Sequence, residues 1–449
     1  MTLANNRVKR INIKKISDGT KESIKPQRFV EVDFPDDFIK EYVKHARRFQ
    51  LYRDDLHKII AVGLIGHATR LWKNSFTGYH GNRIFLLVLG ETNSGKTRGT
   101  IQIPYYTFFN YRKELGIHTL DSGTREMMCR VLYENGAQLF LITEFAGLFA
   151  KEYASGLPEF LNSLYDGMPY SHVSITNRID LSSFQTRSSI FAATTKEQIM
   201  KLFKQRDAYK EVIVAGGFLP RFILMRLKAY TIQQWETLYL ETQAMIENND
   251  ILGEYLLHLL SIKGSVEYSR DAIKTMVNSV REFYNTNADT EEEKDIADIL
   301  ASRVINHIAS VAACKAISPL KNRKIALVQS DDVEWAIKLL KRIYAPAVEY
   351  LATELTQTNT DKEIFKLAQR IYRYISRKKN KIINKRKLMM NLHITAWTLD
   401  KLMPTLDEVF SIKQVIIDGE KYLCANYPYC QDCKFSSTCS RPLKRVMKL

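Results

Sequence analysis

Residues 84 to 97 read Ile84-Phe85-Leu86-Leu87-Val88-Leu89-Gly90-Glu91-Thr92-Asn93-Ser94-Gly95-Lys96-Thr97. The apolar first half predicts a buried strand, and a helix is expected to continue beyond Thr100. The second half is a complete G-x-x-x-x-G-K-T phosphate-binding loop, lying between a strand and a helix as the motif requires. Glycines are needed there because backbone N–H groups must close around an anion with no Cβ in the way. The stretch therefore predicts an α/β domain that binds a nucleotide.

The polar residues of this loop have defined chemical tasks. Lys96 supplies a point charge for the β- and γ-phosphates, and the Thr97 hydroxyl supplies a ligand for Mg²⁺. The N-terminus of the following helix adds partial positive charge on the same side. We therefore take Gly90 to Thr97 as the candidate residues for ATP and Mg²⁺.

The bulk composition favours a globular intracellular protein with an anionic partner. The chain has 449 residues, of which 45% are hydrophobic, and this length suits two or three packed units. Its 66 Lys and Arg against 49 Asp and Glu leave a net charge of +17, for which nucleic acid is the usual partner and mere solubility the alternative. We see no secretory or membrane-spanning pattern, so we expect a cytoplasmic protein without membrane contact.

ATP hydrolysis also needs an acid that orients the attacking water. Residues 139 to 144 form an apolar strand pattern that ends in a carboxylate, which makes Glu144 the candidate base. An acidic residue usually stands just before it to assist Mg²⁺ coordination. Here Thr143 has that place and would act through a water molecule. A core strand that merely ends in Glu is the alternative.

Two later segments offer candidates for contact with the γ-phosphate. A buried strand pattern from Ile190 ends in Thr194 and Thr195, either of which could sense the phosphate or simply cap a turn. Arg221 lies among apolar residues, where a buried charge needs a partner anion. That anion is either the γ-phosphate of a neighbouring subunit or an internal carboxylate.

The order of these segments resembles the AAA+ ATPases, especially the minichromosome-maintenance helicases and the replication-initiator helicases of mobile elements. Pro220-Arg221-Phe222 is similar to the family's Ser-Arg-Phe arginine-finger context, and Ser302-Arg303-Val304 to the second-sensor arginine that opens an alanine-rich lid helix. The motif Asp332-Val333 with Ala336-Ile337 is similar to the next lid helix. The resemblance covers about residues 33 to 345. It implies a hexameric ring with ATP between subunits.

The family also inserts a DNA-contacting β-hairpin before the first sensor strand. Residues 173 to 178 and 179 to 185 alternate as two such strands, with Asn177 and Arg178 at the tip. The resemblance makes these two residues candidate DNA contacts. The family's large N-terminal ring-forming domain has no counterpart in the chain.

The expected organisation has seven parts. Residues 1–32 form a basic flexible arm, 33–80 an N-terminal helical segment, 81–228 the AAA+ core, 229–345 a helical region with the lid, 346–361 a linker, 362–423 a winged helix and 424–449 a cysteine loop with a basic tail. Within the helical region, Glu291-Glu292-Glu293 is expected to be a solvated loop, and residues 299 to 317 a single helix.

The C-terminal part has the order helix, helix, helix, hairpin, which is typical of a winged helix. The hairpin is indicated by Asp418-Gly419 between two apolar strand patterns. In such folds the third helix enters the major groove, so the candidate base contacts are Thr395, Trp397, Thr398 and Lys401. Candidate phosphate contacts are Lys385, Arg386 and Lys387, although a basic run is often only a solvated face. Trp397 could equally be a core residue.

Four cysteines crowd into the end of the chain, at positions Cys424, Cys430, Cys433 and Cys439. Four thiolates in one short loop can enclose a metal, and disulfides are disfavoured inside cells. The spacing resembles the iron–sulfur loop of endonuclease III-type glycosylases, whose first gap is one residue longer. A [4Fe–4S] cluster, a structural Zn²⁺ ion and no metal all stay open.

The sequence thus predicts an oligomeric, ATP-driven DNA helicase or translocase in replication initiation. The alternative is an ATP-controlled switch that assembles on DNA and recruits a transposase or replication protein without unwinding. A third interpretation, an NTPase subunit of a nuclease, finds no supporting carboxylate cluster in the sequence.

Overall fold

The computed structural model describes residues 34–425, except 79, 121–123, 150–155, 174–177, 206–216, 242–244, 285–289, 322, 357–358, 379–381, 409, 411 and 418. Within this range the chain is a mixed α/β protein with one central parallel sheet and many helices. The predicted basic arm and the last three cysteines lie outside the described residues.

The central sheet has five parallel strands in the order β3-β4-β7-β2-β8. Their bounds are Ile117–Leu120 (β3), Leu139–Ile142 (β4), Ser189–Thr194 (β7), Phe85–Gly90 (β2) and Phe222–Leu227 (β8). All six residues of β2 are buried, because a parallel sheet is covered by helices on both faces. The strands predicted at residues 84–89, 139–144 and 190–195 are confirmed as β2, β4 and β7, although β4 ends at Ile142, before the predicted end at Glu144.

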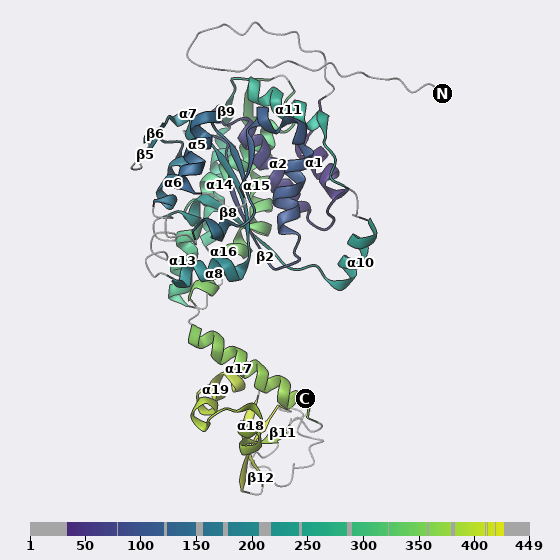
Figure 1. Ribbon diagram of the computed structural model, residues 1–449, viewed down its shortest axis with the longest axis vertical. Helices are drawn as coiled ribbons and strands as arrows, with labels where there is room; N and C mark the ends of the chain where they lie inside the picture. Colours follow the sequence, from purple (N-terminus) through teal and green to yellow (C-terminus); the bar gives the residue numbers. More distant parts are fainter. Residues whose placement is uncertain are drawn as a thin grey trace, which may run out of the picture.

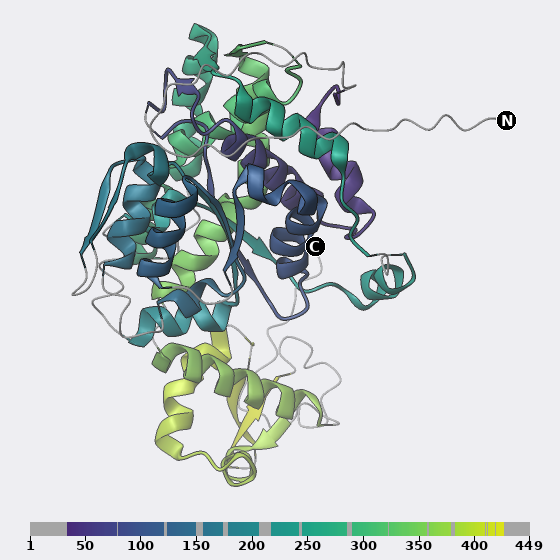
Figure 2. The ribbon, with the colours of Figure 1, turned by 45° about the horizontal axis from the view of Figure 1, so that its top comes forward.

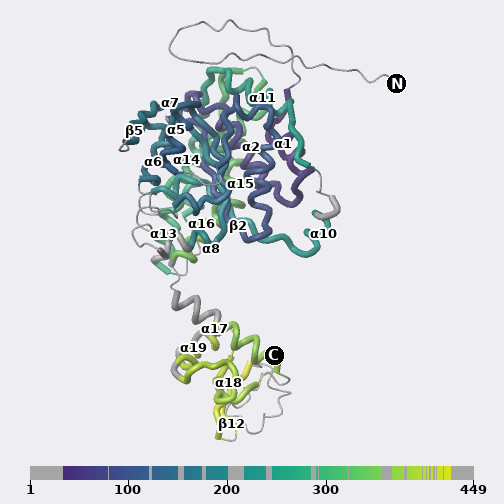
Figure 3. Tube along the Cα trace, in the orientation of Figure 1, coloured from purple at the N-terminus to yellow at the C-terminus, as the bar shows by residue number. Residues whose placement is uncertain are grey.

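Helices surround this sheet (Figure 1). Those before and between its strands are α1 (Phe38–Arg47), α2 (Asp54–Ala68), α3 (Ile103–Thr107), α4 (Arg112–Leu115), α5 (Arg125–Asn135), α6 (Leu157–Asp166), α7 (Ser183–Thr186) and α8 (Lys196–Gln205). Those after β8 are α10 (Ile232–Glu241), α11 (Asp250–Ser261), α12 (Arg270–Tyr284), α13 (Glu291–Ala301), α14 (Val304–Ile317), α15 (Ser330–Ile343) and α16 (Ala345–Thr356). Helix α2 packs on β7, while α15 and α16 pack on β8. Helix α10 stands out from the body in both orientations (Figures 2 and 3).

Two smaller sheets complete this part of the molecule. Strands β1 (Lys73–Asn74), β9 (Ser265–Tyr268) and β10 (Ile325–Val328) run parallel and tie the N-terminal helices to the late helices. Strands β5 (Tyr170–Val173) and β6 (Arg178–Leu181) form an antiparallel hairpin before β7.

The C-terminal unit has its own hydrophobic core, built between Ala368 and Leu423. Its elements are α17 (Asn359–Ser376), β11 (Ile382–Asn384), α18 (Lys385–Leu392), α19 (Ala396–Glu408), β12 (Lys413–Ile417) and β13 (Glu420–Cys424). The three strands pair antiparallel in the order β11-β13-β12. The predicted succession of three helices and a hairpin is confirmed, and β11 was not predicted. Helix α17 leads away from the larger part, and this unit occupies one end of the molecule (Figures 1 and 2).

Several local predictions were wrong. The acidic run from Glu291 is the first turn of α13, because the Thr290 hydroxyl caps the helix at Glu293 N and acids are favoured at a helix N-terminus. Residues 299–317 are not one helix, since α13 ends at Ala301 and α14 begins at Val304. The second strand of the hairpin ends at Leu181, and α7 replaces its predicted end. Most of the predicted linker 346–361 is helical, in α16 and α17.

Hydrogen bonds of the buried Arg83 side chain connect the amino ends of β2 and β7 with the end of α6. Arg83, just before β2, is fully buried, and its guanidinium donates to Leu164 O (2.7 Å), Tyr165 O (3.0 Å) and Ser188 O (3.1 Å). Burial lowers the pKa of Arg83 to about 9. The side chain therefore satisfies the last carbonyls of α6, which have no partner within that helix.

One stretch of the described residues, Glu293–Ile317, has the length and composition of a membrane span. However, 67% of its most apolar window is buried inside the protein, as in the core helix of a water-soluble domain. The stretch is also interrupted at Ser302 and Arg303, between α13 and α14. It is therefore weak evidence for a membrane span.

The buried histidines predict that acid destabilises the fold. Burial lowers the pKa of His57 to about 4, of His80 to about 3 and of His307 to about 4. In the unfolded chain each imidazole titrates near 6.5. As the pH falls from about 6.5 towards 4, the unfolded state therefore binds more protons, and each histidine removes up to about 1.4 kcal/mol of stability per pH unit.

We expect the thermal unfolding midpoint to fall between pH 7.5 and pH 5.5. Replacing His307 by Gln, which keeps a donor for the carbonyl that His307 binds, should flatten that dependence. A midpoint that is independent of pH in this range, or a variant with an unchanged slope, would contradict the prediction.

Candidate nucleotide-binding site

The phosphate-binding loop leaves the carboxyl end of β2 and turns directly into a helix. Asn93 and Gly95 have φ angles of 65° and 75°, in the left-handed region. Helical backbone begins at Lys96 and continues through a π-helical segment (Arg98–Gln102) into α3. A Cβ on Gly90 would lie 2.3 Å from Ser94 Oγ, so the loop closes only with glycine at its start. The predicted strand–loop–helix arrangement is confirmed.

The corner between α1 and α2 holds this loop from the outside. Gln50 is buried, and its Nε2 donates to Gly95 O at 2.8 Å and to the Tyr230 hydroxyl at 3.0 Å. Arg53 Nη2 donates to Ser94 O at 3.0 Å, and its guanidinium stacks 4.0 Å from the centre of the Tyr230 ring. The backbone of the loop is therefore bound by side chains more than forty residues away.

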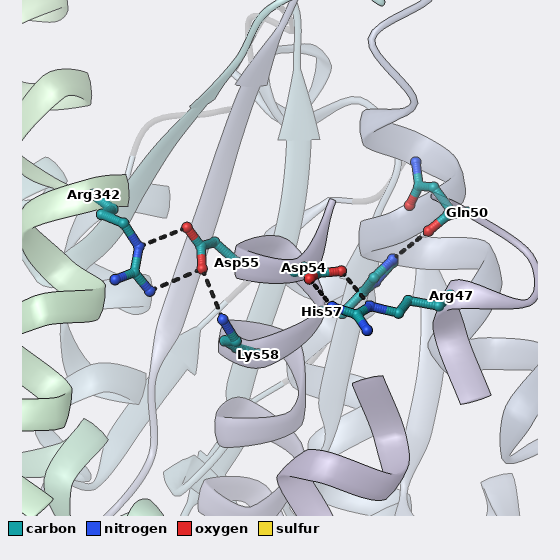
Figure 4. A network of polar contacts seen from close by, with 7 residues as sticks. All are labelled: Arg47, Gln50, Asp54, Asp55, His57, Lys58 and Arg342. Atoms are coloured by element: carbon teal, nitrogen blue, oxygen red, sulfur yellow. Dashed lines mark hydrogen bonds and ion pairs between the residues drawn. The ribbon is translucent and has the colours of Figure 1, made fainter. Parts of the chain in front are cut away.

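A network of ion pairs supports the same corner (Figure 4). Arg47 pairs with Asp54, and Arg342 of α15 donates to both oxygens of Asp55 at 2.9 and 3.0 Å. His57 Nε2 donates to Gln50 O at 2.9 Å, which fixes the residue that grips the loop. The Asp55–Arg342 pair ties the start of α2 to the end of α15.

A cleft of about 1520 Å³ lies at this corner, and its lining includes Arg53 but no residue of the loop itself. It lies between the start of α2, the carboxyl end of β8, and helices α10, α13 and α16. Tyr52 and Arg53 line it, and Arg53 also binds the loop. Tyr52 has a φ of 61° and is 49% exposed, so its backbone is held in a conformation that few aromatic residues adopt.

The other carboxyl-end candidates follow β7, which pairs with β2, and β4, which pairs with β7. Thr194 ends β7 opposite Leu89, and Glu144 follows β4, where its side chain is exposed. Thr143 lies between β4 and Glu144, and its N–H donates to Leu120 O at 3.3 Å. These residues share the edge of the sheet where the loop begins.

The two threonines contact a common glutamine. Thr195 N donates to Gln198 Oε1 at 3.2 Å, and Thr195 Oγ1 accepts from Gln198 N at 3.2 Å, which is the reciprocal bonding of a helix N-terminus. Thr194 is buried, with its hydroxyl 3.4 Å from the same amide oxygen. The hydroxyl of Thr195 therefore caps the N-terminus of α8. Of the two threonines, Thr194 is the one that pairs with β2.

Arg221 and Arg303 lie together at the opposite edge of the sheet. Arg221 directly precedes β8, and its Nη2 donates to Asp166 Oδ2 at 2.8 Å while its Nη1 donates to Gly217 O at 2.6 Å. Arg303 Nη1 lies 3.7 Å from the other oxygen of Asp166. Within the described residues, the internal carboxylate partner of Arg221 is thus Asp166.

The hairpin candidate is only partly described. Arg178 pairs with Val173 across the hairpin and is exposed, with its Nε 2.9 Å from Asp180 Oδ2. Asn177 lies outside the described residues, as do the other tip positions, 174–176. Arg178 therefore begins β6 rather than standing at the tip.

The C-terminal candidates differ in how exposed they are. Lys385 Nζ lies 2.6 Å from Asp400 Oδ1, which neutralises its charge, whereas Arg386 and Lys387 are exposed. Thr395 precedes α19, and its hydroxyl accepts from Thr398 N at 3.1 Å and contacts the Thr398 hydroxyl. Trp397 and Lys401 lie within α19, and their side chains are outside the description.

The cysteine loop is described only at its beginning. Cys424 ends β13 and is buried. Cys430, Cys433 and Cys439 lie outside the described residues, where the metal prediction stays a prediction. Over the described ranges, no group of three or more metal-ligating side chains gathers. Cys129 in α5 and Cys314 in α14 are buried core residues.

No protein-family model matches the chain, and no curated protein matches its sequence.

The sequence patterns missed the residues that hold the loop and the carboxylate between the arginines. Gln50, Arg53 and Tyr230 are far from the motif in sequence, and no spacing rule connects them with it. In the sequence, Asp166 is only a polar residue at the end of a helical pattern, and nothing marks it as a partner of Arg221 or Arg303. The buried apolar context of Arg221 signalled only that an anion partner was required.

The crowded glycine in the loop gives a direct test of this packing. A Cβ at Gly95 would lie 2.3 Å from Gln50 Nε2 at a φ of 75°, so Gly95→Ala should both strain the loop and displace the glutamine. We expect amide hydrogen exchange in peptides covering residues 49–53 and 90–99 to accelerate at least tenfold. Gly78→Ala is the control, since Gly78 has a φ of 59° but open space around it. Equal exchange in the two variants would contradict the packing argument.

Proposed function

We propose that this chain is an ATPase of AAA+ type that assembles into a ring and translocates along DNA as a helicase. The observation that carries the proposal is the separation of two sets of groups on one sheet. The phosphate-binding loop lies at the carboxyl edge, whereas Arg221 and Arg303 lie at the amino edge. Because Phe85 pairs with Phe222 and Gly90 with Leu227, these edges are roughly 17 Å apart along the strands.

This separation means that the two arginines would act on a nucleotide held by another copy. Arg221 is bound to Gly217 O and Asp166 just before the start of β8, at the sheet edge opposite its own loop. A neighbour whose loop edge docks against this amino edge would place a triphosphate beside both guanidinium groups. Positive groups at that position would stabilise charge that develops on the transferred phosphoryl group.

The carboxyl edge supplies the groups that hydrolysis needs within one copy. Lys96 would contact the β- and γ-phosphates, and the exposed Glu144 would orient the attacking water. Thr97 is the residue that would hold Mg²⁺, whose charge would neutralise phosphate oxygens. Thr194, on the strand beside β2, would contact the γ-phosphate.

The cleft beside the loop would take the base and ribose of the nucleotide. Its lining includes both polar and apolar residues, and Tyr52 among them offers an exposed ring. Arg53 joins the two parts of the site, because it lines the cleft and binds the loop backbone.

DNA would bind through the hairpin and the C-terminal unit. The net charge of +17 favours a polyanion. We propose that the C-terminal unit is a winged helix in which the exposed Arg386 and Lys387 contact phosphates and α19 faces the bases. The four cysteines, with a [4Fe–4S] cluster or a Zn²⁺ ion, would hold the basic tail beside it.

A second candidate function is an ATP-controlled switch that assembles on DNA and recruits another protein without unwinding. Thr143 favours it, because a hydroxyl stands where an acid usually assists Mg²⁺ coordination, and slow hydrolysis suits a switch. A strand-displacement assay separates the two functions. A helicase releases the displaced strand, while a switch binds duplex and oligomerises with ATP but releases none.

The first prediction of the proposal concerns Lys96. Lys96→Ala removes the charge that faces the β- and γ-phosphates, so DNA-stimulated ATP hydrolysis should fall at least a hundredfold. Steady-state phosphate release from the purified protein measures it. Lys113→Ala, at an exposed lysine of α4, is the matched control and should keep its turnover. Turnover that survives Lys96→Ala would show that ATP is not hydrolysed at this loop.

The second prediction concerns the seam between copies. Mixing Arg221→Ala chains with Lys96→Ala chains should restore part of the turnover that each lacks alone, because some seams then combine an intact loop with an intact arginine. Adding the Lys96→Ala, Arg221→Ala double variant instead of the Lys96→Ala chain should restore nothing. Equal turnover in both mixtures would argue that Arg221 does not act across an interface.

A further inference from the structure

The carboxylate of Asp166 is the meeting point of Arg221 and Arg303. Arg221 reaches it from the 3-10 turn before β8, and Arg303 reaches it from the break between α13 and α14. Each guanidinium faces a different oxygen, at 2.8 Å and 3.7 Å. Two like charges this close repel one another, and the carboxylate between them offsets that repulsion.

The position of Asp166 in its helix is unfavourable without these partners. It is the last residue of α6, where the helix dipole disfavours an anion. Arg83 already binds the carbonyls of Leu164 and Tyr165 at this helix end. Counting Arg83, three arginines therefore lie near the single carboxylate of Asp166, so the cluster carries more positive than negative charge.

Buried neutral side chains hold both members of the cluster in place. His80 donates to Tyr165 O at 2.9 Å, next to Asp166, and His307 donates to Pro220 O at 2.9 Å, next to Arg221. The Tyr165 ring lies under both arginines, with its centre 5.8 Å from the Arg221 guanidinium carbon and 5.7 Å from that of Arg303. The group is therefore a rigid assembly rather than a chance surface ion pair.

The cluster keeps capacity for a further anion. The Asp166 and Arg303 side chains are 36% and 32% exposed, so they can be reached from outside, whereas Arg221 is only 10% exposed. The buried Nε of Arg221 has no hydrogen-bond partner in the described part of the chain. The Asp166 carboxylate thus contacts the guanidinium groups of both Arg221 and Arg303, but its single negative charge balances only one of their two positive charges.

We infer that Asp166 is a positioning residue that aims Arg221 and Arg303 together at the triphosphate held by a neighbouring copy. The inference rests on the proposed function. Asp166 does not contact the phosphate; it restrains the two guanidinium groups, which then act as one receptor. When Asp166 loses its charge, both arginines remain but their guanidinium groups are no longer held in one orientation. The chemical step then slows, while the affinity for the nucleotide is kept.

The test compares Asp166→Asn and Asp166→Glu with the wild-type protein in DNA-stimulated ATP hydrolysis. We expect Asp166→Asn to lower kcat at least tenfold with KM for ATP within twofold. Asp166→Glu keeps the charge on a longer side chain and should give an intermediate kcat. Asp271→Asn is the matched control, because Asp271 is an exposed carboxylate paired only with the nearby Lys274 among the described ion pairs, and it should leave both constants unchanged.

Each outcome decides the inference. A wild-type kcat in Asp166→Asn, or a raised KM with kcat unchanged, overturns it. If Asp166→Asn does not fold, as judged by circular dichroism, Asp166→Glu decides alone: a lowered kcat at unchanged KM supports the role, and a wild-type kcat rejects it. Lys96→Ala in the same assay separates this inference from the proposed function, because retained turnover there rejects the function itself.

Discussion

The parallel pairing of β2 with β7 and β8 is the constraint on which the rest of the molecule depends. A parallel sheet has two different edges, since every strand begins at one and ends at the other. The register Phe85–Phe222 and Gly90–Leu227 assigns the phosphate-binding loop to one edge and Arg221 to the other. Shifting β8 by one residue would turn its side chains to the opposite face and detach Arg221 from Asp166. The order of the strands thus fixes which groups can meet within one copy.

Both edges are held by buried or half-buried polar side chains as well as by apolar packing. At the carboxyl edge, Gln50 and Arg53 bind the loop backbone, and at the amino edge Arg83 binds the end of α6. Buried donors without partners would cost several kcal/mol, so each of these side chains tolerates few alternative positions. Such networks give up some hydrophobic packing and in return specify the conformation of loops that apolar contacts would leave variable.

The sequence predicted the elements whose signal is local. The apolar run at residues 84–89 and the hairpin around Gly419 follow from patterns within about ten residues. The first turn of α13 at Glu291 was predicted as a loop, because a run of acidic residues is also typical of a solvated loop. Thr290 and Glu293 nevertheless have the spacing of a capping box, which marks the start of a helix. Gln50, Tyr230 and Asp166 could not have been predicted, since their roles exist only after distant segments pack together.

The two edges also constrain how copies of this chain could associate under the proposed function. The cationic amino edge and a carboxyl edge that holds a triphosphate would be complementary to each other but not to themselves. A pairing of identical edges would bring two arginine clusters, or two triphosphates, into contact, which like charges disfavour. Under the proposed function these edges would therefore meet head to tail, and a head-to-tail contact makes a ring if its rotation closes and a filament if it does not. The choice between ring and filament then depends on the angle at which one amino edge meets the next loop, and the rigid frame around Asp166 holds that edge in one orientation.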